Sequence, residues 1–130
     1  MALWVGVVTY ELNAGKKAKA TTIWQEYVRP FLTQQKDCVG ALWMVAEDGD
    51  RAISIDFWDN KLAAGAFETS GLYNKLITNF DPVLAQRPVR MECQADDAFA
   101  FAGDQSKTKD IDLKLHETMT ISFKSKKAKD

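Results

Sequence analysis

The sequence predicts an α+β domain with elements in the order β-α-β-β-α-β, a four-stranded antiparallel sheet with two helices on one face. Two observations predict it. Short segments whose apolar side chains recur at every second residue, typical of strands, flank longer segments with the helical period of about 3.6 residues. Asp48-Gly49 lies between the second and third strand segments and favours a tight hairpin, because Gly adopts the positive φ that such turns need.

The first strand and the first helix are the most strongly patterned elements. Residues 3–12 are largely apolar on both sides, as expected for a central strand that is buried on both faces. Residues 16–35 carry a helical apolar stripe, which we expect to face the sheet: Ile23, Trp24, Tyr27, Val28, Phe31 and Leu32. Pro30 lacks an N–H and its ring crowds the preceding turn, so a kink is predicted over residues 26–30.

Three further strands and a second helical region complete the domain. The strands are expected at residues 39–46, 51–58 and 89–95. The helical region spans residues 61–80 and is broken at Ser70-Gly71. Asp59 and Asn60 precede it, where a short polar side chain can accept a hydrogen bond from the first free helix N–H groups.

The chain divides into one domain and an extension. Residues 1–95 of the 130 hold all six predicted elements. Residues 96–130 are expected to be a C-terminal extension with linker at 96–97 and 103–106 and short strands at 111–115 and 119–123. Four lysines among the last seven residues predict a solvated, frayed end.

Composition excludes several classes of function. The net charge is −1 and no basic patch with interleaved aromatic residues occurs in the body of the chain, so no nucleic-acid partner is expected. No apolar run approaches the roughly 18 residues that span a bilayer, so no membrane partner is expected either. Cys38 and Cys93 form no CxxC motif, and the start of the chain lacks the positive segment of a signal peptide. These features predict a reduced, cytoplasmic protein.

The segment from Ile53 to Tyr73 resembles the antibiotic-biosynthesis-monooxygenase family of dimeric α+β barrels. Members of that family have a strand ending in Trp, a capped helix rich in Ala, and a Ser followed by an aromatic residue. Here these positions are Trp58, Asp59-Asn60, Ala63-Ala64, Phe67, Ser70 and Tyr73. The resemblance implies a ferredoxin-like domain that pairs with a second copy through its sheet. The strands themselves also favour a homodimer, because the first two are apolar on both sides.

The resemblance further implies a small-molecule site between the helices and the sheet, near the dimer interface. The candidate catalytic residues are Tyr27, Asn60 and Tyr73, and the candidates for binding an aromatic substrate are Tyr10, Trp24, Trp43, Trp58 and Phe67. Each aromatic side chain has the alternative of filling the core, and Asn60 has the alternative of capping its helix.

No cofactor and no metal is expected at this site. Heme-degrading members of the family ligate iron through a His several residues after the Ser, and that position is Ile77 here. The single histidine, His116, lies in the extension.

Two classes of function therefore remain open. One is a cofactor-independent monooxygenase acting on a quinol or phenolic substrate, as the resemblance implies, with a dry pocket that orients the substrate and stabilises its anion. The other is a non-catalytic small-molecule binding or stress-related module on the same fold.

Overall fold

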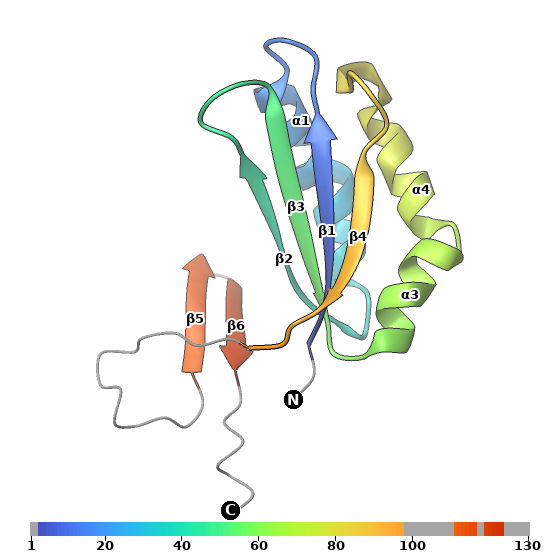
Figure 1. Cartoon of the computed structure of the whole chain (residues 1–130), viewed down its shortest axis with the longest axis vertical. Coiled ribbons are helices and arrows are strands. Elements are labelled where there is room, and N and C mark those ends of the chain that lie inside the picture. The colour runs from blue at the N-terminus through green and yellow to red at the C-terminus, as the bar shows by residue number, and fades with distance from the viewer. Residues whose placement is uncertain (1–2, 98–110, 117–118, 124–130) are drawn as a thin grey trace, which may run out of the picture.

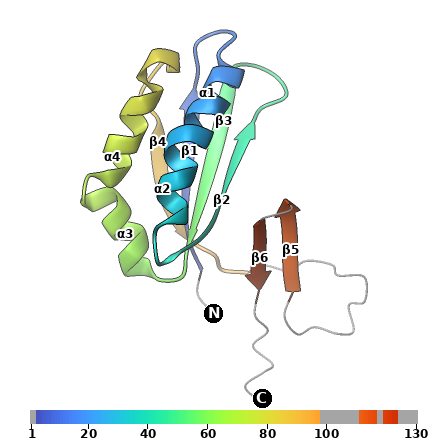
Figure 2. The same cartoon turned by 180° about the vertical axis from the view of Figure 1, so that it is seen from behind.

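The computed structural model of the chain describes residues 3–97, 111–116 and 119–123. A four-stranded antiparallel sheet has the order β2-β3-β1-β4, and helices cover one of its faces (Figures 1 and 2). Its strands are β1 (Trp4–Glu11), β2 (Cys38–Val45), β3 (Arg51–Trp58) and β4 (Val89–Gln94). The predicted fold is confirmed, including the antiparallel hairpin of β2 and β3, whose turn places Gly49 at φ +76°.

The first helix is continuous but changes its winding at the centre. It consists of α1 (Lys17–Ile23), a π-helical turn η1 (Trp24–Val28) and α2 (Arg29–Thr33). Pro30 lies in the first turn of α2, where a missing N–H is tolerated best. The irregularity predicted near Pro30 is therefore a widened turn just before it.

The widened turn also decides which way Tyr27 points. A π-helical turn holds more residues than an α-helical one, so it shifts the buried stripe relative to the α-helical period. Trp24, Val28 and Leu32 are buried at spacings of four, whereas Tyr27 is 49% exposed. The expectation that the Tyr27 ring faces the sheet is wrong, because it assumed an unbroken α-helical period.

The second helical layer is α3 (Lys61–Thr69), α4 (Leu72–Ile77) and a 3₁₀ segment η2 (Thr78–Val83). The Asn60 side chain accepts a 2.7 Å hydrogen bond from the backbone N–H of Ala63, which caps α3 as expected. Gly71 takes φ +87°, a left-handed conformation that favours glycine, and it separates α3 from α4. The predicted break at Ser70-Gly71 is confirmed.

The opposite face of the main sheet has no helix on it in the described part of the chain; Figure 1 views this face. Three side chains of this face are well exposed, namely Met44 at 41%, Val89 at 62% and Met91 at 58%. The strands expected near 111–115 and 119–123 are present as β5 (Ile111–His116) and β6 (Met119–Phe123), which pair as a separate two-stranded sheet. The β6 strand of this small sheet lies beside β2 of the main sheet.

Some predictions about the extension concern residues that the structure does not describe. The linker at 103–106 and the lysine-rich end lie outside the described residues. A division of the chain near residue 95 remains a prediction. Within the described ranges, no helix is both long and apolar enough to cross a membrane.

Candidate active site

A buried ion pair lies between the sheet and the helices. Arg90 on β4 donates from Nη1 to Asp56 Oδ2 at 2.8 Å and from Nη2 to Asp56 Oδ1 at 3.0 Å. The two side chains are 1% and 6% exposed. Such a bidentate pair is stronger and more directional than a single hydrogen bond. It fixes two compensating charges at the floor of the helix-covered face.

The pair crosses the central strand at Gly6. Gly6 on β1 pairs with Asp56 on β3 and with Glu92 on β4. A Cβ at Gly6 would overlap the guanidinium of Arg90. The Arg90 side chain therefore reaches Asp56 across β1 because position 6 has no side chain.

Two aromatic rings cover the guanidinium on its helix side. Its central carbon lies 5.0 Å from the Phe67 ring centroid and 5.4 Å from that of Tyr73, within cation–π range. Burial disfavours the charged form of Arg90, but the hydrogen bonds and negative charge of Asp56 outweigh burial and raise the Arg90 pKa. The cation is therefore held permanently charged beside the rings. The indole N–H of Trp58 donates to Asp56 Oδ1.

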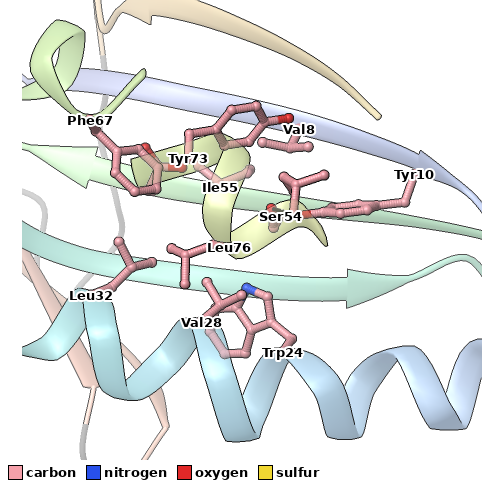
Figure 3. A pocket seen from close by; sticks show the side chains of 12 residues that line it. Val8, Tyr10, Trp24, Val28, Leu32, Ser54, Ile55, Phe67, Tyr73 and Leu76 are labelled. Carbon is pink, nitrogen blue, oxygen red and sulfur yellow. Dashed lines mark hydrogen bonds between the residues drawn. The ribbon is translucent and has the colours of Figure 1, made fainter. Parts of the chain in front are cut away.

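A small internal cavity, the inner cavity, lies beside these rings (Figure 3). Phe67 and Tyr73 stand at one end, and Tyr10 and Ser54 at the other. Its volume is about 20 Å³. A single water needs about 10–15 Å³ on this measure, so the inner cavity holds one group of that size.

The inner cavity is lined by polar groups without partners. Trp24 Nε1 and Tyr73 Oη are buried and have no hydrogen-bond partner among the described residues. Figure 3 shows the indole nitrogen of Trp24 pointing from its helix into the cavity. Tyr10 Oη, by contrast, is paired with Ser54 Oγ at 2.9 Å. Unpaired buried donors are unfavourable and favour an acceptor at this position.

Both buried phenols stay neutral at physiological pH. Burial raises the pKa of Tyr73 to about 12, although the positive charge of Arg90 acts in the opposite direction. Burial also raises the pKa of Tyr10 far above its usual value, against the effect of the Ser54 hydrogen bond. The Tyr73 hydroxyl therefore keeps its proton and can donate a hydrogen bond to a ligand.

A larger, solvent-open pocket, the outer pocket, lies between α3, α4 and the turn after α2. Its volume is about 310 Å³, at the lower end of the range of ligand pockets, about 300–1,000 Å³. Lys36, Asp37 and Ser70 provide polar groups on its wall, and Trp58 contributes its ring. Phe67 lines both this pocket and the inner cavity. Its ring is thus a wall between the two.

The structure brings most of the sequence-predicted residues to these two spaces. Tyr10, Trp24, Phe67 and Tyr73 line the inner cavity, and Trp58 lines the outer pocket. Trp43 stacks on Trp24 and Phe80, and its indole N–H donates to Thr21 Oγ1 at 2.8 Å. Trp43 lines neither of the two spaces. Asn60 serves as the cap of α3, outside both spaces, and Tyr27 points outward.

Sequence reasoning missed the ion pair. It gave neither Arg90 nor Asp56 a role. A signal was present: an acidic residue on the same side of β3 as the buried Ser54 and Trp58 needs a buried partner.

Comparisons with known proteins agree with the fold. No family model and no curated protein sequence matches the chain. Solved structures do match. One is a protein of unknown function from Nitrosomonas europaea, with TM-score 0.63 and 14% identity, covering 79% of this chain and 98% of that one. Another is a "putative antibiotic biosynthesis monooxygenase" from Bordetella bronchiseptica, with TM-score 0.62 and 14% identity, covering 73% and 98%.

A third match carries a ligand. It is a monooxygenase from Streptomyces coelicolor in complex with nanaomycin D, with TM-score 0.60 and 16% identity, covering 76% of this chain and 92% of that one. The chain has the antibiotic-biosynthesis-monooxygenase fold. The resemblance inferred from residues 53–73 is confirmed at the level of this fold. In the monooxygenase fold of this chain, the helix-covered sheet face carries the Arg90–Asp56 pair and both pockets.

Proposed function

We propose that the protein binds a phenolic or quinol-type aromatic molecule and oxidises it with O2, without a cofactor. The observation that carries the proposal is the pair of buried donors without partners, Trp24 Nε1 and Tyr73 Oη, on residues that line the inner cavity together with the Phe67 ring. A hydrogen-bond donor favours the anionic form of a bound phenol. The fold shared with the Streptomyces coelicolor monooxygenase, which is in complex with nanaomycin D, supports a monooxygenase that acts on a small molecule.

The chemistry follows from that anion. A phenolate is far more electron-rich than a phenol and can transfer one electron to O2, giving a phenoxyl radical and superoxide. Combination of the two forms a C–O bond, and loss of water from the resulting peroxide leaves a quinone. The overall balance is one phenol and one O2 to one quinone and one water. Tyr73 holds the developing oxyanion, and the apolar walls exclude water.

We further propose that two copies of the chain associate through the open sheet face. Met44 on β2 and Val89 and Met91 on β4 expose apolar side chains there, and apolar residues exposed on one sheet face favour an interface. A second copy of the same face satisfies a two-fold, self-complementary contact. We also propose a cytoplasmic location. The free thiols of Cys38 and Cys93 fit a reducing compartment.

The alternative is a binding module without catalysis on the same fold. One observation favours it: the outer pocket is open to solvent, but the Phe67 ring separates it from the inner cavity. A molecule that stays in the outer pocket would be bound without reaching Tyr73.

Oxygen consumption distinguishes the two functions. The purified protein is incubated with a panel of naphthols and quinols while dissolved O2 is followed, with heat-denatured protein as the control for autoxidation. Enzyme-dependent uptake of one O2 per phenol supports the monooxygenase. No uptake above the control, together with a melting temperature raised by the same compounds, supports the binding module and overturns the proposed reaction.

A further inference from the structure

The Phe67 ring fills an aromatic slot between the two pockets. Its centroid lies 5.4 Å from that of Trp58, 5.9 Å from that of Tyr73 and 6.2 Å from that of Phe31. The Arg90 guanidinium covers it at 5.0 Å. These are the distances at which aromatic pairs and cation–π pairs attract. The slot therefore suits any six-membered aromatic ring.

We propose that Phe67 is an internal placeholder: the ring of the ligand takes its position in the slot, and a single oxygen substituent of that ring enters the inner cavity. This inference deepens the proposed function and rests on the same site. It names the recognised group, a planar ring with one carbonyl or phenolic oxygen directed at the Tyr73 hydroxyl.

The inner cavity selects an oxygen rather than an apolar group. Its 20 Å³ admit one group of the size of a water. Two donors face it without partners, the indole N–H of Trp24 and the hydroxyl of Tyr73, on residues that are 6% and 7% exposed. A methyl group would leave the Tyr73 hydroxyl unsatisfied, whereas a carbonyl or phenolic oxygen accepts a hydrogen bond from it.

The outer pocket gives the Phe67 ring space to leave the slot. Its 310 Å³ lie on the other side of the ring. The α3 helix that carries Phe67 ends at Thr69, and Gly71 separates it from the six residues of α4. A rotation of the side chain toward the outer pocket therefore requires no change in the sheet. A ligand ring in the vacated slot keeps the cation–π contact with Arg90.

Phe67→Ala tests the slot directly, because it leaves a ring-sized void. Binding of phenol and of toluene is measured by titration calorimetry in Phe67→Ala and in Phe67→Ala/Tyr73→Phe. We expect both ligands to bind Phe67→Ala, and removal of the Tyr73 hydroxyl to reduce the preference for phenol over toluene about tenfold, the value of one hydrogen bond.

Phe80→Ala is the matched control. Phe80 is fully buried, and its ring contacts Tyr10 and Trp43, whose polar atoms already have partners. Its void should take both ligands with a preference that does not depend on Tyr73. An equal loss of preference in both voids, or no loss in the Phe67 void, would overturn the placeholder.

A second measurement uses the parent chain and covers the case in which Phe67→Ala does not fold. The aromatic NMR signals of Phe67 are identified as those that Phe67→Leu removes. Saturation with 1-naphthol should shift them strongly as the ring leaves the slot. Bound naphthol that leaves these signals unchanged contradicts the inference. Neither readout involves turnover, so a chain that binds by this mode but consumes no O2 would refute the proposed reaction alone.

Discussion

The guanidinium of Arg90 occupies the space in which Gly6 would carry a side chain. This relationship links a glycine in the middle of the central strand to the charge at the centre of the candidate site. Glycine normally weakens a strand, so its presence here has a specific steric reason.

Gly6→Ala should therefore be strongly destabilising. The added methyl displaces Arg90 from Asp56 and leaves a buried charge without its partner, which typically costs about 3–5 kcal/mol. Gly65→Ala is the control, since its nearest neighbour would be Glu92 Oε1 at 4.0 Å. Because Gly65 lies in the interior of α3, Gly65→Ala should raise the free energy of unfolding by about 0.5–1 kcal/mol. Urea unfolding of the two variants and the parent measures both effects; a Gly6→Ala variant as stable as the parent would refute the steric account.

Tyr73→Phe and Tyr10→Phe should differ in stability although both remove one buried hydroxyl. Tyr10 loses its hydrogen bond to Ser54 and leaves Ser54 unpaired, which should cost about 1–2 kcal/mol. Tyr73 loses no hydrogen bond to a described residue, so its change should be neutral or slightly stabilising. Free energies of unfolding at neutral pH are compared. A larger loss for Tyr73→Phe would show that its hydroxyl has a structural partner.

Alkaline pH should destabilise the folded chain partly through Tyr73. Its pKa rises from 10.0 to about 12 in the folded state. The stabilising contribution is complete below pH 10. Between about pH 10 and 12 the unfolded chain loses this proton while the folded chain keeps it, so the free energy of unfolding falls by up to about 2 kcal/mol. Unfolding measured from pH 9 to 11.5 should show a smaller fall for Tyr73→Phe than for the parent, and parallel curves would contradict the assignment.

Catalysis, if the proposed function holds, should depend on Tyr73 and not on Tyr27. Removing a hydrogen bond to a developing anion costs roughly 1.5–3 kcal/mol, so Tyr73→Phe should lower kcat about ten- to a hundredfold. Tyr27→Phe removes a hydroxyl from a side chain that is 49% exposed and should leave turnover unchanged. Initial rates of O2 uptake are measured for both. Equal rates in all three proteins would remove Tyr73 from the mechanism.

Met91→Lys should separate the proposed dimer. Met91 is 58% exposed on the open sheet face, where a buried, unpaired ammonium at a two-fold contact is strongly unfavourable. Leu62→Lys is the control, because Leu62 on α3 is 83% exposed and lies on the helix layer. Light scattering should give twice the chain mass of 14.6 kDa for the parent and Leu62→Lys, and the single mass for Met91→Lys. A parent that scatters as a monomer would rule out the interface.

Element order could be predicted from the sequence because it depends on short-range periodicity. The alternation of Ile53, Ile55 and Phe57 lies within one strand. The change of period after Trp58 lies within a few residues of the chain. The Asn60 cap has the same local origin.

The site could be predicted less fully because it depends on relationships between elements. The orientation of Tyr27 depends on a single π-helical turn, which no residue preference indicates. The Arg90–Asp56 pair depends on strand register across Gly6, and the pairing residues are far apart in the sequence. Of the aromatic residues expected at the site, Tyr27 is exposed instead. Which of the buried ones have unpaired polar atoms is visible only in three dimensions.

The position of β4 has a kinetic consequence. Asp56 and Arg90 are 34 residues apart, and β1 pairs with β3 on one side and with β4 on the other. During synthesis Asp56 emerges well before the arginine that neutralises it, so β3 cannot settle fully onto the helices until β4 docks. We expect β4 to complete the core in one late, cooperative step. Pulsed hydrogen exchange would show this step as simultaneous protection of β1, β3 and β4. Nascent chains released before residue 90 would then be the ones that need chaperones most.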